Sequence, residues 1–364
     1  MSKVRVAVVF GGRNSEHAVS LMGAGSVFEA IDRDKYDVVP VGIARDGRWV
    51  LAPGTQRYAL EGSDLPEVDE SGAALALPFD ASGLIAYEPG EVPNTLGEVD
   101  VVFPVLHGPY GEDGTIQGLL EMAGVRYVGS GVLASAVGMD KEFMKTVLAG
   151  AGLPVGRYVV VRDRDWRHDR KRVLEDVEEL GYPVFVKPAR AGSSQGISKA
   201  HDLESLEAAI EFAREHDPKV LVEAAIVGRE VECAVLESLG DEPPQASVPG
   251  EVLVRGDHEF FDFEAKYIGD DMALSVPADI PAEKAEEIRA LAVRAFEALG
   301  CEGLSRVDFF YTPSGEVIFN EINTMPGFTA VSVAPQLWAA SGLPYSALVD
   351  RLIQLALAKP QGLR

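Results

Sequence analysis

Residues 306–323 read RVDFFYTPSGEVIFNEIN, and this stretch decides how the rest of the chain is interpreted. Two runs rich in β-branched and aromatic residues flank a Pro/Gly turn, a pattern that is typical of a β-hairpin. Side chains alternate between the two faces of a strand, so Arg306 and Asp308 share one face, and Glu321 and Asn323 share one face. If the hairpin closes symmetrically about its Ser-Gly turn, Asp308 lies opposite Glu321.

Two carboxylates paired in this way have Cβ atoms roughly 5 Å apart. They shift each other's pKa unless a cation lies between them. The side chain of Asn323 adds a neutral oxygen, which completes the all-oxygen ligand set that Mg²⁺ prefers. The alternative is an ordinary solvated hairpin face, but Phe309, Phe310 and Phe319 indicate a buried sheet, where bare charges are costly. The hairpin therefore predicts a metal site, provided that its register does not slip by one residue.

The composition narrows the class of protein. A chain of 364 residues suggests two or three domains, and 47% hydrophobic with 25% charged residues is usual for a globular protein. The 57 acidic and 33 basic residues give a net charge of −24, which excludes nucleic acid and anionic membranes as main partners. A nucleotide polyphosphate would also be repelled, so binding one requires locally placed lysines or arginines and a metal ion.

Several features indicate a cytoplasmic protein. Cys233 and Cys301 lack the spacing of a metal site, which suits a reducing compartment and argues against a disulfide scaffold. The apolar run 4–10 is too short for a signal peptide and leads into two glycines instead of a cleavage site. No apolar stretch approaches the roughly 20 residues that span a bilayer.

The N-terminal region alternates strands and helices. The continuous apolar run 4–10 is typical of a strand in a parallel sheet covered on both faces. Further strands are expected at 36–43 and 99–106, and helices at about 15–30 and 115–123. This alternation, up to about residue 130, predicts an open, doubly wound α/β sheet. Residues 49–97 are too poorly patterned to place any element.

Shorter elements follow and predict two α+β units. The expected domains are therefore 1–130, 131–223 and 224–364. The central unit holds expected helices and strands at 141–151, 158–161, 173–180, 182–187 and 220–223. The C-terminal unit holds expected strands near 230–236 and 245–253, a loop at 255–271, a long helix at 282–299 and the hairpin.

The common phosphate-binding motifs are absent. The chain has no Gly-x-x-x-x-Gly-Lys-Ser/Thr loop, and Gly11-Gly12 does not complete the Gly-x-Gly-x-x-Gly pattern of dinucleotide sites. Lys187 instead ends a predicted strand and is followed by GSSQG at 192–196. The glycines allow backbone N–H groups to form an anion-binding nest, with hydroxyls from Ser193 and Ser194 and the charge of Lys187. The alternative is a flexible surface turn.

Together these features resemble the ATP-grasp superfamily and, within it, the D-alanine–D-alanine ligases. The likeness covers nearly the whole chain and is carried, in order, by GGRNSEHAVS (11–20), HGPYGEDG (107–114), MDK (139–141), KP (187–188), EAKY (264–267), SRVD (305–308) and EINTMPG (321–327). Phe261 and Phe263 stand where the family often has tyrosines, and segment 54–91 is longer than in compact members. The resemblance implies an ATP-grasp fold, in which an open doubly wound sheet is followed by two α+β subdomains that clamp ATP.

The implied activity is ATP-dependent ligation of two D-alanines to D-alanyl-D-alanine through an acyl phosphate, with release of ADP and phosphate, for peptidoglycan precursor synthesis. The resemblance also implies two Mg²⁺ ions, replaceable by Mn²⁺, and a homodimer. Metal ligands are then Asp308, Glu321 and Asn323. Implied ATP-binding residues are Lys141, Lys187, Ser193, Ser194, Glu223, Glu230, Lys266, Asn320 and Glu321. Of the lysines, Lys266 is expected on the γ-phosphate and the other two on the α- and β-phosphates.

The resemblance assigns further residues to the amino-acid substrates. Implied catalytic residues are Glu16, Ser193, Tyr267, Arg306 and Gly327. Implied substrate-binding residues are Glu16, His107, Arg306, Gly327 and Ser332. Three of these have simpler explanations: Glu16 as an acid favoured by a helix dipole, His107 as a turn residue, and Ser332 as a helix N-cap.

Two alternative functions remain open in the sequence. One is a D-alanine–D-lactate ligase of the same family, in which a histidine-bearing lid takes the place of Tyr267. The loop 255–271 resembles such a water-excluding lid, and its Lys266-Tyr267 pair favours the dipeptide. The other is a non-catalytic ATP-binding sensor, which predicts a damaged metal or oxyanion set. The hairpin acids and Arg306 are all present, which argues against a sensor.

Overall fold

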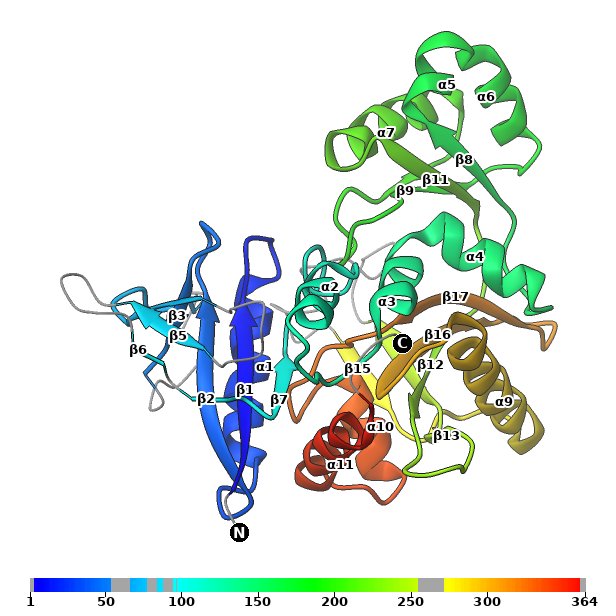
Figure 1. Cartoon of the computed structure of the whole chain (residues 1–364). Helices are drawn as coiled ribbons and strands as arrows, with labels where there is room; N and C mark the ends of the chain where they lie inside the picture. The colour runs from blue at the N-terminus through cyan, green and yellow to red at the C-terminus, as the bar shows by residue number, and fades with distance from the viewer. Residues whose placement is uncertain are drawn as a thin grey trace.

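The protein folds into three sheets (Figure 1). Three cavities are lined by residues of these three regions, and we call them together the cleft. The computed structural model describes residues 3–53, 66–76, 84–87, 94–95, 97–254 and 272–360. The expected lid at 255–271 and most of the segment 54–91 lie outside the described residues.

The N-terminal sheet has the strand order β6-β5-β4-β3-β2-β1-β7. Its strands are β1 (Val4–Gly11), β2 (Tyr36–Ile43), β3 (Trp49–Leu51), β4 (Ala74–Ala76), β5 (Ile85–Tyr87), β6 (Asn94–Thr95) and β7 (Val101–Pro104). β1 pairs in parallel with β2 and β7, as expected of an α/β sheet, whereas β2 to β6 are joined by antiparallel pairing. This antiparallel extension is built from residues whose sequence pattern predicts no element.

Helices cover both faces of the parallel strands. Alternate residues of β1 point to opposite faces, so Val6 packs with α1 (His17–Ala30) and α11 (Tyr345–Ala358), and Ala7 packs with α2 (Thr115–Met122). The prediction of a doubly wound arrangement is therefore confirmed for this part of the sheet. The prediction did not include α11, which returns from the far end of the chain to complete one layer.

The central sheet has the order β10-β9-β11-β8 and lies apart from the other two, in green in Figure 1. Its elements are β8 (Tyr158–Arg162), α5 (Asp163–His168), α6 (Arg170–Glu178), β9 (Val184–Pro188), β10 (Ser198–Ala200), α7 (Leu203–His216) and β11 (Lys219–Ala224). A capping box between Asp202 and Ser205 starts α7. The helices and strands enclose a core of their own, with Leu206 and Ile210 fully buried.

The C-terminal sheet has the order β15-β14-β12-β16-β17, with β13 on β12. Its elements are β12 (Arg229–Leu236), β13 (Gln245–Ala246), β14 (Gly250–Val254), β15 (Met272–Ser275), α9 (Ala282–Leu299), β16 (Leu304–Tyr311) and β17 (Val317–Asn323). The bounds of α9 match the prediction because Pro281 precedes its first turn and Gly300, at φ 66°, ends it.

Four helices join regions that are distant in sequence. α3 (Val132–Met139) and α4 (Lys141–Gly150) share a core with α9, β16 and β17, although they precede the central sheet in the chain. α10 (Val333–Ala340) and α11 share a core with both the N-terminal sheet and the C-terminal sheet. The cleft is thus bordered by the central sheet on one side and by these joined regions on the other.

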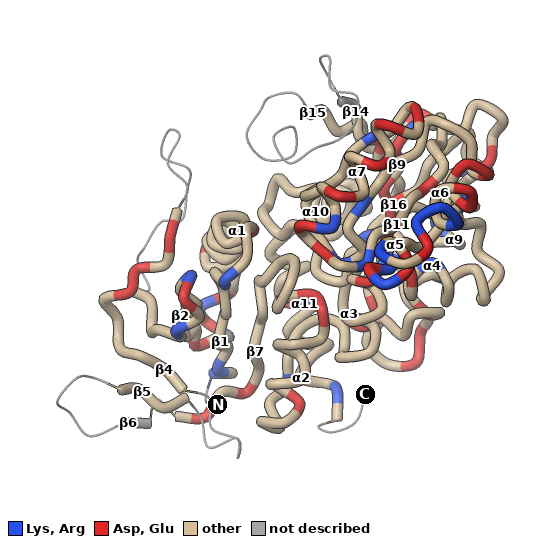
Figure 2. Tube along the Cα trace, turned by 90° about the horizontal axis from the view of Figure 1, so that it is seen from above, with Lys and Arg blue, Asp and Glu red and all other residues tan. Residues whose placement is uncertain are grey.

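Charge is unevenly distributed over these regions. Acidic residues occur along the whole trace, whereas Lys and Arg gather around α4, α5 and α6 (Figure 2). Among the described residues, no helix combines the length and apolarity that a membrane span requires.

Candidate active site

The hairpin β16–β17 places its two acids as predicted, although its register is not uniform. Asp308 pairs with Glu321, and Arg306 pairs with Asn323. Nearer the turn, Phe309 pairs with Phe319, so the register shifts by one residue between Asp308 and Phe309. Without this bulge, Asp308 would lie opposite Asn320.

A backbone hydrogen bond and an aromatic contact lie beside the bulge. The N–H of Phe319 donates to the carbonyl of Pro154 at 2.7 Å, which holds this side of β17 against the segment after α4. The rings of Phe309 and Phe319 meet edge to face at 5.9 Å inside the core shared with α9. The aromatic side chains therefore fill one face of the hairpin, and the acids remain on the other face, at the cleft.

A guanidinium group lies beside the hairpin acid Asp308. Arg306 donates to both oxygens of Asp308, at 2.8 and 2.7 Å, and its Nε lies 2.8 Å from Glu232 Oε2. Asn323 Nδ2 also donates to Asp308, at 3.2 Å. Burial alone would lower the pKa of Arg306, but Asp308 and Glu232 raise it well above its ordinary value.

The donors on this face suit a hard divalent cation. Asp308, Glu321 and Asn323 offer carboxylate and amide oxygens on neighbouring strands that line the cleft. Among the described residues, no group of three or more His, Cys, Asp or Glu forms a metal cluster, so the set consists of two acids and one amide. Asp308 is also bonded to Arg306, and an ion on that carboxylate would replace part of this pairing.

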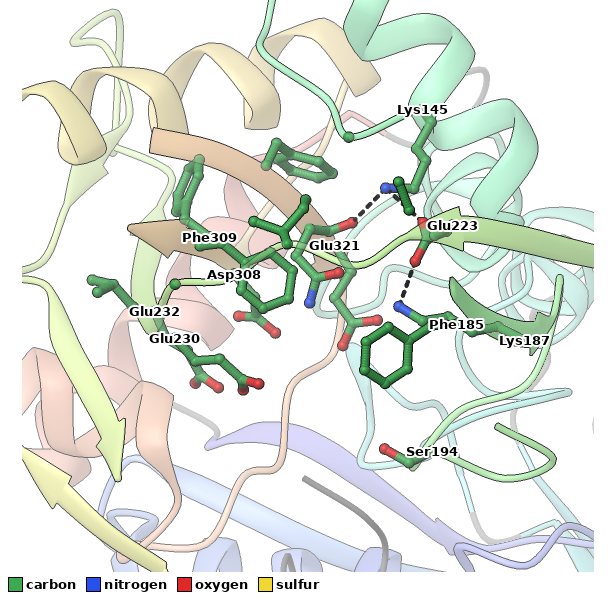
Figure 3. Close-up of a pocket in the computed structure, with 18 of the residues that line it drawn as sticks. Lys145, Phe185, Lys187, Ser194, Glu223, Glu230, Glu232, Asp308, Phe309 and Glu321 are labelled. Atoms are coloured by element: carbon green, nitrogen blue, oxygen red, sulfur yellow. Dashed lines mark hydrogen bonds and ion pairs between the residues drawn. The ribbon is translucent and has the colours of Figure 1, made fainter. Parts of the chain in front are cut away.

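Across the cleft, a carboxylate in the central sheet holds two lysines. Glu223, on β11, lies 2.5 Å from Lys187 Nζ and 2.8 Å from Lys145 Nζ (Figure 3). Burial favours neutral Glu223, but the two ammonium groups outweigh burial and lower its pKa. Burial also opposes the charge of Lys187, yet the carboxylates around it raise its pKa.

The predicted loop 192–196 adopts a conformation suited to an anion nest. Ser193 and Ser194 have left-handed backbone angles, at φ 48° and 57°, which are uncommon for residues other than glycine. Lys141 Nζ donates to the carbonyl of Ala191 at 2.9 Å, which ties α4 to the start of this loop. Ser193, Ser194 and Lys141 all line one cavity beneath the loop.

The loop meets the N-terminal sheet at Glu16. A Cβ atom at Gly192 would collide with Glu16 Oε1, and one at Gly108 would lie 2.7 Å from the same oxygen. Because neither glycine has a Cβ, the backbone can approach this carboxylate closely at both positions. Glu16 lies just before α1 but caps it with no side-chain hydrogen bond, so its carboxylate faces the cleft instead.

Two further titratable groups lie behind Glu16. His107 Nδ1 contacts the carbonyl of Met325 at 3.0 Å, and burial lowers the pKa of His107. Glu112 accepts N–H bonds from Gly108 at 2.8 Å and from Met325 at 3.1 Å. Burial and the charge of Glu16 raise the pKa of Glu112 to about 8, against the effect of those donors. Glu112 thereby connects the two loops that border this end of the cleft.

Ser332 occupies the N-cap position of α10 without capping it through its side chain. Its hydroxyl instead accepts from the N–H of Thr329 at 3.0 Å. A Cβ at Gly327 would lie 3.3 Å from Ser332 Oγ, so the turn brings the two residues together at the cleft.

Every predicted site residue within the described ranges lines one of three adjoining cavities. The cavity between the central sheet and the hairpin is lined by Lys187, Ser194, Glu223, Glu230, Arg306, Asp308, Asn320 and Glu321. The cavity beneath the loop is lined by Lys141, Lys187, Ser193, Ser194, Glu321 and Asn323. The cavity beside the N-terminal sheet is lined by Glu16, His107, Ser193, Arg306, Glu321, Asn323, Gly327 and Ser332. Lys266 and Tyr267 lie outside the described residues. Glu321 borders all three cavities, which therefore adjoin one another at this residue.

Three ionisable residues that line the cleft are missing from the sequence predictions. Lys145 lies four residues after Lys141 on the same helix, so helical periodicity could have found it. Glu232 follows Glu230 by two residues on β12 and therefore shares its face. Glu112 lies within the HGPYGEDG motif, where its position alone gave no sign of burial.

Comparison with known proteins identifies the family. The models "D-ala D-ala ligase N-terminus" and "D-ala D-ala ligase C-terminus" match residues 5–130 and 147–354. The chain is 62% identical to the D-alanine–D-alanine ligase of Arthrobacter sp. (strain FB24), covering 100% of this chain and 96% of that protein. It is 56% identical to that of Streptomyces coelicolor (strain ATCC BAA-471 / A3(2) / M145), covering 99% and 95%.

Solved structures agree. The crystal structure of the VanG D-Ala:D-Ser ligase from Enterococcus faecalis is 39% identical, with a TM-score of 0.83 over 98% of this chain and 100% of that chain. The D-alanine-D-alanine ligase from Coxiella burnetii is 32% identical, with a TM-score of 0.81 over 98% and 94%. With three sheets around a cleft and family models over both halves, the chain belongs to the D-alanine–D-alanine ligase family and has the ATP-grasp fold.

Proposed function

We propose that this protein joins two D-alanines into D-alanyl-D-alanine through an acyl phosphate, with conversion of ATP to ADP and phosphate, for peptidoglycan precursor synthesis. The family membership supports the reaction, and one observation in the structure carries the assignment to this cleft. Asp308 and Glu321 lie opposite each other on the hairpin, where Glu321 borders all three adjoining cavities. A nucleotide and two amino acids can therefore meet beside one pair of acids.

The nucleotide occupies the cavity between the central sheet and the hairpin. Lys141 and Lys187 hold the α- and β-phosphates, and the nest at Ser193 and Ser194 donates N–H and hydroxyl bonds. Glu223 and Glu230 lie on the ribose and adenine side, with Asn320 and Glu321 completing the contacts. Lys266, outside the described residues, is assigned to the γ-phosphate. Because the protein carries a large negative charge, these few cations provide the local attraction that a polyphosphate needs.

Asp308, Glu321 and Asn323 hold the divalent metal that the family uses. We assign two Mg²⁺ ions, replaceable by Mn²⁺, because the donors are hard oxygens. Metal bound there neutralises charge that develops on the β- and γ-phosphates.

The amino acids occupy the cavity beside the N-terminal sheet. Glu16 anchors the ammonium of the first D-alanine, with Ser193 and Tyr267 in its network, and neutral His107 lies beside that substrate. Arg306 and the N–H of Gly327 stabilise the oxyanion that forms at the carbonyl. Ser332 binds the carboxylate of the second D-alanine.

The reaction proceeds in two steps. The carboxylate of the first D-alanine attacks the γ-phosphorus of ATP, the bond from that phosphorus to the bridging oxygen breaks, and the products are an acyl phosphate and ADP. The amine of the second D-alanine then attacks the acyl carbon and expels phosphate. Glu16 and Ser332 raise the rate by holding the two amino acids in place, because this converts a bimolecular step into an effectively unimolecular one.

We further propose a homodimer located in the cytoplasm. The low cysteine content and acidic composition support the compartment.

The second substrate can be tested directly. We expect that adding D-lactate to D-alanine does not raise the rate of phosphate release above that with D-alanine alone between pH 6 and 8. The same comparison is made with D-serine, because the similar VanG protein is a D-Ala:D-Ser ligase. Faster turnover with D-lactate or D-serine near neutral pH would contradict the dipeptide assignment.

The metal assignment has its own test. Glu321→Gln preserves size and removes one ligand charge, so we expect turnover to fall at least about 100-fold while the protein stays folded. Circular dichroism checks the fold. Near-normal turnover of the variant would contradict the assignment.

A further inference from the structure

The central sheet holds one acid between two lysines. Glu223 Oε2 pairs with Lys187 at 2.5 Å and Oε1 pairs with Lys145 at 2.8 Å, from opposite sides (Figure 3). The side chain of Lys145 is 3% exposed, that of Glu223 is 11% exposed and that of Lys187 is 15% exposed. Glu223 is thus largely removed from water, and a carboxylate there is costly unless cations stay beside it.

Lys145 lies in a helix that packs on the C-terminal sheet, whereas its two partners lie in the central sheet. It lies on α4, which packs with Met144 and Leu148 in the core of the C-terminal sheet. Its Nζ also lies 3.5 Å from the carbonyl of Asn320, the extra residue of the hairpin bulge. Lys145 therefore connects Glu223 in the central sheet to the hairpin that carries the predicted metal ligands.

The pairing of Lys187 presents a difficulty for nucleotide binding. A lysine that binds phosphate must loosen its bond to Glu223, and a buried carboxylate left alone is strongly unfavourable. A second cation that stays on Glu223 removes this cost. Lys145 is placed to do so, because its ammonium reaches the other carboxylate oxygen.

We propose that Lys145 is a positioning residue that keeps Glu223 neutralised while Lys187 turns to the phosphates of the bound nucleotide. This inference rests on the proposed function, since it assumes that a nucleotide occupies the cavity. It implies that Lys145 affects polyphosphate affinity through Glu223 and Lys187, without touching phosphate itself. Lys145 then differs from the lysines assigned to phosphate contact.

A matched control exists beside the first turn of the same helix. Lys219, also on β11, pairs with Asp140 at 2.5 Å and Glu142 at 3.0 Å, so it too joins β11 to α4. It lines none of the three cavities. Lys219→Met therefore removes a similar ion pair between the same two elements without changing the charge around Glu223.

The test is calorimetric titration of MgADP and of adenosine into the full-length protein, Lys145→Met, Lys145→Arg and Lys219→Met. We expect Lys145→Met to weaken MgADP at least about tenfold and adenosine far less, because only the phosphates compete for Lys187. Lys145→Arg should retain most of the affinity, and Lys219→Met should change it by less than about threefold. Equal losses in Lys145→Met and Lys219→Met, or equal losses for both ligands, would overturn the inference.

A second variant covers poor folding of Lys145→Met. The double variant Lys145→Met/Glu223→Gln removes the carboxylate that pairs with Lys187, so Lys187 is released and the MgADP-to-adenosine affinity ratio should return to within about threefold of the original. A ratio that stays at least about tenfold lower would overturn the inference. Failure of the unmodified protein to bind MgADP would contradict the proposed function, and the inference with it.

Discussion

The guanidinium of Arg306 has two carboxylates within reach, and only one of them is a predicted metal ligand. Asp308 accepts two hydrogen bonds from it, and Glu232, whose side chain is 5% exposed, lies on its other side. If a metal ion takes Asp308, Arg306 depends on Glu232 to remain paired within the cleft. Glu232 would then keep Arg306, the proposed oxyanion donor, paired while the metal ion binds Asp308.

Glu232→Gln tests this separation. With Glu232 neutral, Arg306 holds Asp308 more strongly, so Mn²⁺ must compete harder, and its affinity in the presence of ADP should fall roughly tenfold. Electron paramagnetic resonance of free Mn²⁺ measures the affinity without turnover. Glu251→Gln, which breaks a similar pair with Arg229 on the same sheet, is the control. Equal losses in the two variants would contradict a specific role for Glu232.

Glu112 predicts a pH dependence of stability. Its pKa of about 8 in the folded protein, against an ordinary value of 4.5, means that the native state holds a proton that the unfolded state has released between these pH values. Stability therefore falls as pH rises through this window, by up to about 1.4 kcal/mol per pH unit. Urea denaturation of the protein and Glu112→Gln at pH 5.5, 7 and 8 should show the difference moving in favour of the variant. A difference independent of pH would refute this.

The residues of the cleft differ in how far sequence alone reveals them. Strand alternation and a symmetric turn predict that Asp308 lies opposite Glu321, and the structure has this pair. The bulge that produces it was not predictable, since the register at the turn alone would place Asp308 opposite Asn320. Lys145 and Glu232 are not singled out, because their significance depends on partners in other elements, Glu223 and Arg306. Pairing across distant segments follows from packing, which a local pattern does not encode.

At the scale of elements, α4 begins at a residue with two tasks. Asp140 accepts N–H bonds from Glu142 and Phe143 as an N-cap, and it also pairs with Lys219 of β11. The residue that starts the helix therefore also fixes it to the central sheet. Lys141 follows directly, and its N–H donates to the carbonyl of Ala189 at 3.0 Å.

Two substitutions separate these tasks. Asp140→Asn keeps the cap and loses the ion pair, whereas Asp140→Ala loses both. We expect Asp140→Ala to lower the free energy of unfolding by about 1 kcal/mol more than Asp140→Asn, the usual value of a cap. Urea denaturation gives both values. Equal losses would mean that the cap contributes nothing here.

Elements with their own start and stop signals were predicted best. α9 has proline before it, glycine after it and buried residues at helical spacing, so its bounds agree with the prediction. The strands β3 to β5 have three residues each, too few to show a period. The buried helices α10 and α11 were not predicted, although they complete the core between two sheets. Their role became visible only from tertiary packing.

At the scale of the whole molecule, the cores define two bodies. One core contains Val6 of β1, Leu304 of β16 and Leu352 of α11, so the N-terminal and C-terminal sheets are joined. The core of the central sheet, which includes Leu206, contains none of these residues. Cooperative unfolding should follow this division.

Hydrogen exchange can resolve the two bodies. Leu206→Ala should speed amide exchange in β9 and β11 and leave β1 and β16 unchanged, because only the central core gains a cavity. Leu352→Ala should speed exchange in both β1 and β16. Exchange that changes uniformly over all strands in either variant would contradict the division.

The shared core behind α11 limits how the cleft can open. The central sheet is linked to the rest by two short stretches of chain, 151–157 and 225–228, which together can serve as a pivot. Rotation about them carries Gly192 and Ser193 away from Glu16, while His107 and Arg306 keep their separation because they belong to the joined body. A single swing of this kind would uncover the cavity between the central sheet and the hairpin and one wall of the cavity beside the N-terminal sheet at once, so the two cavities would open and close together.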